Sequence, residues 1–272
     1  MIPQIQFTLN VIAGLIASYT DLKTGYIYDW LTYPLIAAGV LLSIYTQQWI
    51  GLLLGAIIYV IGWLAYRSGK IGGGDIKFLM GIALVQPVYQ GMIYVFSVLL
   101  AAALAACLGL SIFYLGKFLL TRPKIKWKTR RKGMALILGI GILVYIIFSQ
   151  QNPVWPLETS WVLGISLLAG ILFYAFEEEI KTHSFLKRIT LDELEDDEVL
   201  AVEHLTQEEK QKLGKHATDL IGTEDKMKLK HMGIHTLPVY RNLPKFAPFL
   251  FIGILVVYLF PEWIIPLVPA VF

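Results

Sequence analysis

Charge is scarce in this chain of 272 residues, because only 16% of them are Asp, Glu, Lys or Arg and 56% are hydrophobic. Soluble globular domains contain about 25% charged residues. The mean hydropathy is +0.63. A helix of roughly 20 apolar residues spans the core of a bilayer. This composition therefore disfavours a soluble globular protein and predicts an integral membrane protein.

Cysteine is nearly absent, since Cys107 is the only one in the sequence. A single cysteine excludes a disulfide within the chain. It lies in a run of alanine and leucine, so we interpret it as a small buried hydrophobic side chain.

The N-terminal segment lacks positive charge, because the first charged residue is Asp21. A secretory signal peptide has a positively charged region ahead of its apolar part. We therefore expect no cleaved signal peptide, and we expect the first apolar segment to remain as a span.

Apolar segments are what the sequence has in abundance, and they predict an all-α bundle of about seven to eight transmembrane or half-spanning helices. Segment 76–86 is too short to cross a bilayer, because about eleven residues rise roughly 16 Å against a core of roughly 30 Å. It is either a half-helix packed inside the bundle or continuous with the next segment near Gln86 and Pro87. The segments are 3–19, 31–46, 49–66, 76–86, 88–116, 133–149, 160–176 and 246–261.

A polar stretch interrupts the apolar pattern between the last two segments. Residues 177–245 hold fifteen of the twenty acids and all five histidines. We predict a membrane domain at 1–176, a small soluble insert at 177–245, and a C-terminal transmembrane helix with its tail at 246–272.

The twelve basic residues outside this insert gather at alternate connections between the apolar segments. Basic connections face the cytoplasm in membrane proteins. The sequence therefore predicts an outer N-terminus and places residues 20–30, 67–77, 117–132 and the insert in the cytoplasm. This topology requires segment 76–86 to return the chain to the far side.

The densest basic stretch is RPKIKWKTRRKG at 122–133. With a span on each side, it is better explained as a topology anchor at anionic lipid headgroups than as a nucleic-acid site. His231 and His235 are spaced like metal ligands, but Gly233 weakens a helix between them and no cysteine lies nearby. We expect no nucleic acid, no metal and no cofactor.

Only five carboxylates lie outside the insert. Glu158 and Glu262 fall on the predicted outer side, whereas Asp21, Asp29 and Asp75 fall at the cytoplasmic ends of spans. Ionisable groups at membrane depth are costly and usually functional. The predicted topology brings Asp21 and Asp75 to one membrane face, although 54 positions separate them in the chain.

Each of these aspartates also has a local structural interpretation. For Asp29, capping of the second span is favoured. Asp75 precedes the short helix and could cap it, and Asp21 could form an Asx turn ahead of Gly25. In KIGGGDIKFL, the glycines 72–74 favour close approach of another backbone to Asp75. A phosphate loop is disfavoured, because the Walker spacing is missing and a carboxylate repels an anion.

Two aspartates brought together in a poorly solvated site share a proton. Such a dyad can activate a water molecule while its protonated member polarises a carbonyl group. The membrane part offers no competing catalytic set based on serine, histidine or lysine. Lys77 follows Asp75 closely, and we expect its side chain to reach the lipid headgroups.

The sequence from Gly72 to Lys77, GGGDIK, resembles the GxGD motif, and TDLKTGYIYDWLTYP resembles the element that carries the first aspartate of the same family. Together they are similar to type IV prepilin peptidases, including the archaeal preflagellin peptidases. The motifs cover about residues 10–85, and the arrangement of segments extends the likeness to about 116. Tyr28 departs from the family, in which proline is common there. The missing four-cysteine domain suggests the archaeal, peptidase-only type, and residues 243–253 fit archaeal members with a C-terminal extension.

The resemblance implies a membrane aspartic endopeptidase with Asp21 and Asp75 as its catalytic residues. Its substrates would be precursors of pilins and archaellins with class III signal peptides, cut at the cytoplasmic membrane face. The leader would lie extended along Gly72, Gly73 and Gly74, with Asp29 as a further contact. The acids EDDE at 195–198 either attract the basic leader or form a solvated face.

Two other classes of protein remain open. An intramembrane protease of the presenilin or signal-peptide-peptidase type also uses GxGD, but its first aspartate usually lies inside a span. A proton-coupled transporter would use aspartates as proton relays. Such a transporter would more naturally show repeated halves with broken helices, and no convincing repeat is present.

Overall fold

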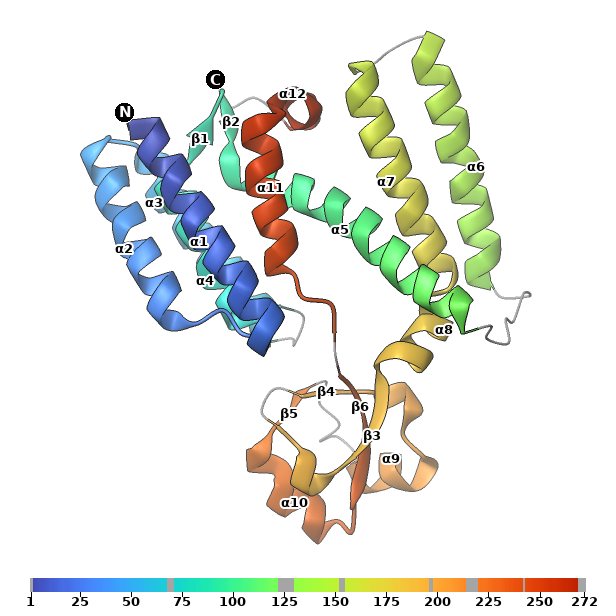
Figure 1. Ribbon diagram of the computed structural model, residues 1–272. Helices are drawn as coiled ribbons and strands as arrows, with labels where there is room; N and C mark the ends of the chain where they lie inside the picture. Colours follow the sequence, from blue (N-terminus) through green and yellow to red (C-terminus); the bar gives the residue numbers. More distant parts are fainter. Residues whose placement is uncertain are drawn as a thin grey trace.

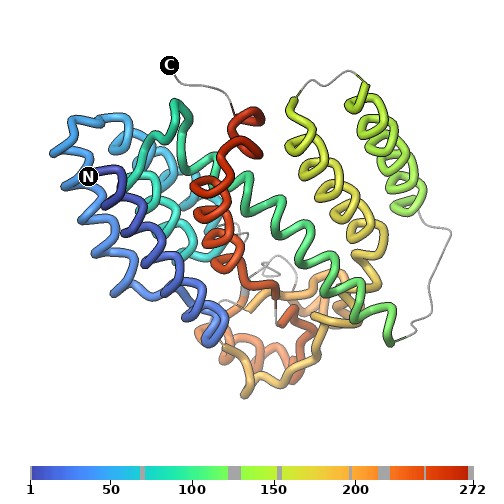
Figure 2. Tube along the Cα trace, turned by 45° about the horizontal axis from the view of Figure 1, so that its top comes forward, coloured from blue at the N-terminus to red at the C-terminus, as the bar shows by residue number. Residues whose placement is uncertain are grey.

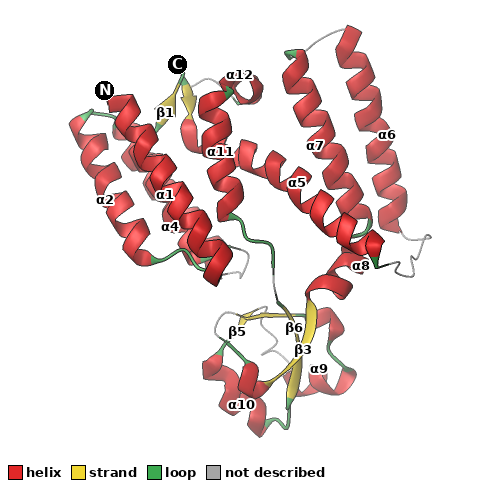
Figure 3. Ribbon diagram, viewed as in Figure 1, coloured by secondary structure: helices red, strands yellow, loops and turns green. Residues whose placement is uncertain are grey.

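The computed structural model describes residues 2–67, 71–121, 130–151, 155–195, 198–213, 220–241 and 243–268. Long helices form one bundle, and a small unit with a β-sheet lies at one end of it (Figure 1). Helices dominate the colouring by secondary structure in Figure 3. The predicted all-α membrane bundle is confirmed, and the strands among the described residues belong to this small unit and to one hairpin.

Eight long helices correspond to the eight apolar segments, with boundaries that differ by a few residues. Polar or glycine-containing turns end most of these helices. The chain order is α1 Ile2–Thr24, α2 Asp29–Tyr45, α3 Trp49–Arg67, α4 Gly73–Val85, α5 Tyr94–Leu120, α6 Arg130–Gln151, α7 Leu157–Ala175 and α11 Ala247–Leu259.

Helix α4 is short and packs inside the bundle against α2 and α3. Its residues Ile82, Ala83 and Val85 are fully buried. It does not continue into α5, because a hairpin of β1 Val88–Tyr89 and β2 Met92–Ile93 lies between them. The half-helix interpretation is therefore correct, and the alternative of one continuous helix is wrong.

The connections alternate between the two ends of the bundle. The N-terminus, the turn between α2 and α3, and the β1–β2 hairpin lie at one end (Figure 1). The sheet unit lies at the other end, together with the ends of α1, α3 and α5 and the starts of α2, α4 and α6. Helix α4 and the hairpin return the chain to the first end. The predicted alternation of basic and non-basic connections requires this return.

Four helices among the described residues are long and apolar enough to cross a membrane, namely α3, α5, α6 and α7. Helix α11 joins them if it is counted together with α12 Pro261–Ile264 and η6 Ile265–Leu267, from which it is bent by 106°. Helix α2 is a shorter apolar helix of 17 residues. The chain is therefore a membrane protein.

The bundle has two parts joined by α5. Helices α1–α4, α5 and α11 enclose the main hydrophobic core. Helices α6 and α7 pair with each other, and α7 packs on α5. Figure 2 shows α5 running diagonally between the α1–α4 group and the α6–α7 pair.

The sheet unit folds around a core of its own. Helix α8 and the π-helical turn η1 lead into it, and β6 leads out toward α11. Its sheet is antiparallel with the strand order β3-β6-β4-β5. The elements are α8 Glu177–Ile180, η1 Lys181–Phe185, β3 Leu186–Thr190, η2 Leu191–Glu193, β4 Glu198–Leu200, η3 Val202–His204, α9 Gln207–Leu213, β5 Leu220–Ile221, η5 Thr223–Asp225, α10 Lys226–His231 and β6 Thr236–Tyr240.

Acidic side chains of this unit bind basic side chains within the unit, which the sequence did not indicate. Glu198 is buried and accepts a hydrogen bond from Arg241 Nε at 2.7 Å. It is therefore not free to attract a basic leader, and Asp196 and Asp197 lie outside the described residues. The part of the EDDE hypothesis that concerns Glu198 is wrong, because a buried carboxylate needs a partner within the fold.

The basic cluster at 122–133 is described only from Arg130 onward. Arg131 lies 2.9 Å from Glu177, and Lys132 pairs with Glu179. These two bases therefore bind acids at the start of the sheet unit rather than serving only as lipid contacts. The stretch 122–129 lies outside the described residues.

Candidate functional site

Asp21 belongs to the buried face of α1. Gln6, Asn10, Ala17 and Ser18 lie on this face at helical spacing, and Asp21, with 6% of its surface exposed, ends it. The helix continues to Thr24. The predicted Asx turn is therefore wrong, since Asp21 lies in the last turn of a helix.

Gly25 ends this helix. It has a φ of +81°, and its amide donates to the carbonyl oxygen of Asp21 at 2.8 Å. A glycine in the left-handed region is a common end to a helix. The chain turns sharply after Asp21 for this reason.

The carboxylate of Asp21 reaches the start of α11. The amide of Ala247 donates to Asp21 Oδ2 at 3.1 Å, and Ser18 Oγ donates to the carbonyl oxygen of Ala247 at 3.2 Å. The N-cap residue Phe246 has no side-chain acceptor for this helix. Asp21 thus supplies from α1 the acceptor that helix N-termini require.

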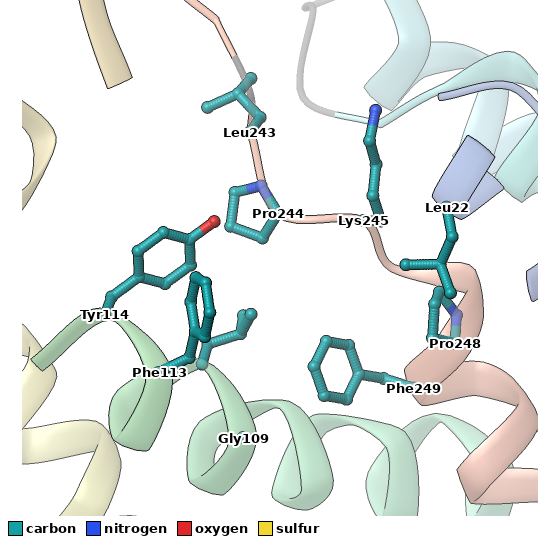
Figure 4. A pocket seen from close by; sticks show the side chains of 10 residues that line it. Leu22, Gly109, Phe113, Tyr114, Leu243, Pro244, Lys245, Pro248 and Phe249 are labelled. Atoms are coloured by element: carbon teal, nitrogen blue, oxygen red, sulfur yellow. The ribbon is translucent and has the colours of Figure 1, made fainter. Parts of the chain in front are cut away.

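Lys245 lies at the same place. A Cβ added to Gly25 would be 2.5 Å from Lys245 Nζ, so the ammonium group packs against this glycine. Figure 4 shows Lys245 on the segment that leads from Leu243 and Pro244 into α11. Sequence reasoning missed Lys245 and Ala247. The available signal was that an apolar helix starts after Phe246 without Ser, Thr, Asp or Asn as its cap.

Asp75 lies in the first turn of α4, whose N-cap is Gly72. Its carboxylate accepts a hydrogen bond from the Gly72 amide. This is one half of a capping box, in which the third helical residue reaches back to the cap. The N-cap is therefore Gly72 and not Asp75, so the prediction that Asp75 caps this helix is wrong.

Both aspartates lie outside the apolar segments 3–19 and 76–86, and both have raised pKa values. Burial and, to a smaller extent, the negative charge of Asp21 together raise the pKa of Asp75 to about 6, and the Gly72 amide opposes both. Burial also raises the pKa of Asp21, against the Ala247 amide, the Lys245 ammonium and the Phe246 amide.

The two carboxylates therefore interact through their charges. Among the hydrogen bonds of the described residues, none joins one carboxylate directly to the other. A like charge nearby disfavours ionisation of both groups at once.

Gly74 lies against the connection between α1 and α2. A Cβ there would be 2.7 Å from the carbonyl oxygen of Ile27, whereas a Cβ at Gly73 would meet only Tyr66 at 3.8 Å. At Gly74, the missing side chain thus lets another part of the same chain, the backbone at Ile27, approach closely. The connection after Asp21 can lie directly on the helix of Asp75 for this reason.

Asp29 and Lys77 form an ion pair with Nζ and Oδ1 2.5 Å apart. Lys77 Nζ also lies 4.8 Å from the ring centre of Tyr33. The N-cap of α2 is Tyr28, so the prediction that Asp29 caps this helix is wrong. The prediction that Lys77 reaches lipid headgroups is wrong as well, because it binds a carboxylate and a ring on α2.

An open cavity of about 390 Å³ lies beside the segment that leads into α11 (Figure 4). Its lining is mostly apolar, with Lys245 as its charged residue, and Leu22 brings it next to Asp21 along α1. The other lining residues are Gly109, Leu110, Phe113, Tyr114, Leu243, Pro244, Pro248 and Phe249.

The described residues include no group of three or more His, Cys, Asp and Glu side chains placed to hold a metal ion. His231 and His235 are both exposed. Carboxyl groups such as those of Asp21 and Asp75 can donate and accept protons.

Residues 8–122 match the type IV leader peptidase family. This segment contains Asp21, Asp29, Asp75 and the three glycines 72–74. It ends before the sheet unit and before Lys245 and Ala247.

Two curated relatives were found. The chain is 31% identical over 98 residues to a preflagellin peptidase of Methanococcus maripaludis, which is 33% of this chain and 42% of the relative. It is 28% identical over 93 residues to the prepilin peptidase EppA of Methanothermobacter thermautotrophicus, which is 31% of this chain and 24% of the relative. The chain thus spans less than half the length of each of these relatives. No solved structure matches.

Proposed function

We propose that this chain is a membrane aspartic endopeptidase, because residues 8–122 match the type IV leader peptidase family. Its substrates are precursors of the prepilin and preflagellin kind, with a short basic leader ahead of an apolar helix. The observation that carries the proposal is the position of Asp21 and Asp75 at one end of the bundle, both poorly solvated and with the charge of Asp21 acting on Asp75.

The proposed reaction is hydrolysis of one peptide bond. The ionised aspartate takes a proton from a water molecule while the water oxygen bonds to the carbonyl carbon, and the protonated aspartate gives its proton to the carbonyl oxygen. The carbon–nitrogen bond then breaks, the leaving nitrogen takes the first proton, and the carbonyl oxygen returns the second. The dyad ends in its starting state, with one proton shared between two carboxylates.

The position of the dyad fits such a substrate. Asp21 and Asp75 lie at the bundle end that carries the basic connections and the sheet unit. In the predicted topology this end faces the cytoplasm. An apolar substrate helix lying beside the bundle presents the junction with its leader at this level.

The room for an extended leader is at Gly72 and Gly73. Gly74 is covered by the backbone of Ile27, whereas Gly73 has only Tyr66 at 3.8 Å from an added Cβ. We therefore assign the backbone contact with the leader to Gly72 and Gly73. Asp29 remains a proposed contact of the leader. In the structure its carboxylate pairs with Lys77.

The test is cleavage of a peptide that carries a class III leader and the first turns of its apolar helix, in membranes that contain the full chain. Asp21→Asn and Asp75→Asn should each reduce the cleavage rate by at least a thousandfold, on the order of the loss when an acid–base group is removed. Glu158→Gln, an exposed carboxylate at the opposite end of the bundle, is the matched control and should retain the native rate.

Cleavage that persists in either aspartate variant would exclude the dyad. If the native chain leaves the leader peptide intact but cuts within the apolar helix, the presenilin-like class is favoured. Proton-coupled uptake that both variants lose would favour a transporter.

A further inference from the structure

We infer that Asp21 and Asp75 have different and fixed roles, and that the segment Lys245–Ala247 fixes them. Asp21 is the ionised member that takes a proton from water, and Asp75 is the protonated member that donates to the carbonyl oxygen. Lys245 is a positioning residue that holds Asp21 in its charged form. This inference rests on the proposed function, and it adds residues that lie outside the family-matched segment 8–122.

The first argument is the pair of hydrogen bonds around Ala247. Its amide donates to Asp21 Oδ2, and its carbonyl oxygen accepts from Ser18 Oγ, so α1 holds one peptide of α11 from both sides. The amide is among the first of α11, where helix N–H groups lack partners within the helix and carry partial positive charge. Such an environment favours the carboxylate over the carboxylic acid.

The second argument is the ammonium group of Lys245. It packs against Gly25, four residues after Asp21 and at the end of the same helix. The left-handed glycine leaves no side chain in this space. A cation at this position attracts the Asp21 carboxylate, and burial of that carboxylate to 6% exposure limits the screening by water.

Several elements packed near Asp21 carry charged groups. Asp75 on α4 is the nearby like charge, and Lys245 opposes it. Lys23 on α1 is exposed and lies 5.7 Å from the ring centre of Tyr19. Asp29 and Lys77 neutralise each other between α2 and α4.

Asp75 has fewer neighbouring groups that stabilise its charged form than Asp21 has. The groups that act on it are the Gly72 amide, which favours its charge, and Asp21, which disfavours it. When two carboxylates share a proton, it resides on the one whose charged form is less stabilised. The proton of the dyad therefore resides on Asp75.

The inference is tested by the pH dependence of kcat/KM for the leader peptide, in the full chain and in Lys245→Gln. As a base, Asp21 must be ionised, so kcat/KM rises with pH through its titration. Removing the cation makes ionisation harder, and this acidic limb should move up by on the order of one pH unit. At pH values below this acidic limb, kcat/KM of Lys245→Gln should be about tenfold lower than that of the native chain. The alkaline limb should move less.

Two further variants separate charge from folding. Lys245→Arg keeps the cation and should restore the native profile. Lys23→Gln removes an exposed charge two residues from Asp21 and should leave both limbs in place.

The protonation of Asp21 can also be followed without activity. The infrared band of the carboxylic acid that is lost in Asp21→Asn should titrate at higher pH in Lys245→Gln than in the native chain. If the native chain does not cleave, the proposed function fails while this titration still decides the inference. An unchanged band and an unchanged acidic limb in Lys245→Gln would overturn it, as would an equal shift in Lys23→Gln.

Discussion

At the scale of single residues, Asp21 and Asp75 form a pair whose two members have different surroundings. Asp21 has an amide and a nearby cation from the far end of the chain, whereas Asp75 has one amide from its own helix turn. Unequal surroundings of this kind separate the pKa values of two carboxylates, and the proposed division of acid and base roles between Asp75 and Asp21 rests on this difference.

The different surroundings of Asp21 and Asp75 should be visible in the pH dependence of kcat/KM. Burial and the neighbouring charge raise the pKa of Asp75 to about 6, so this group loses its proton as the pH rises through 6. An acid that must be protonated is then lost, and kcat/KM should fall about tenfold per pH unit above roughly pH 7. Initial rates at substrate concentrations well below KM, between pH 4 and pH 8, measure this limb. A profile that stays flat from pH 5 to pH 8 contradicts the assignment of Asp75 as an acid.

The sequence predicted the positions of these two aspartates better than their contacts. Their meeting followed from the alternation of apolar segments and basic connections, which is a long-range pattern. The ion pair between Asp29 and Lys77 could not be predicted, because the two residues are 48 positions apart and meet only when α2 packs on α4. The capping rule considers only the neighbours of Asp29 in the chain, and tertiary contact overrode it.

At the scale of elements, glycines decide how closely the helices approach α4. A Cβ at Gly39 on α2 would be 2.5 Å from Leu84 Cβ, and one at Gly62 on α3 would be 2.4 Å from Ile76 Cγ2. Small residues allow helix backbones to come close where lipid supplies no hydrophobic driving force. The short α4 is thereby enclosed, and its first turn is held beside the end of α1.

Substitution of Gly74 tests how the connection after Asp21 packs on α4. Gly74→Ala brings a methyl group to 2.7 Å from the Ile27 carbonyl oxygen, so backbone must shift, at a cost of about 1–3 kcal/mol. The midpoint of thermal unfolding in detergent should fall by several degrees. Gly73→Ala, at the preceding position of the same helix turn, is the matched control and should leave the midpoint unchanged or slightly higher. Equal midpoints for the two variants would contradict this packing.

The elements themselves were largely predictable, because long apolar runs indicate membrane helices well. The β1–β2 hairpin was missed for a physical reason. Its strands have two residues each, and its turn depends on Gln90 and Gly91 with φ values of 48° and 78°. Apolar residues on both sides of this turn made the segment look like the start of α5.

At the scale of the whole molecule, the two ends of the bundle differ in charge. One end carries the connections without basic residues, and the other carries the sheet unit with its acids and bases. The predicted orientation follows from this difference, with the sheet unit in the cytoplasm.

Cysteine labelling tests this orientation in intact cells. In a Cys107→Ala background, Glu158→Cys at the start of α7 should react with a membrane-impermeant maleimide from outside. Glu208→Cys on α9 should react only after the membrane is permeabilised. Both positions are exposed, so access to the reagent is limited only by the side of the membrane on which they lie. The reverse pattern would invert the topology and place Asp21 and Asp75 outside the cell.

The hydrogen bond between Asp21 and Ala247 spans 226 positions of the chain, and this has a consequence for the order of synthesis. Both aspartates leave the ribosome early, whereas Lys245 and Ala247 leave it only after the sheet unit has been made. A nascent chain therefore contains both aspartates long before Asp21 gains its contacts with Ala247 and Lys245. These contacts form only when α11 docks on α1, after the sheet unit has been made.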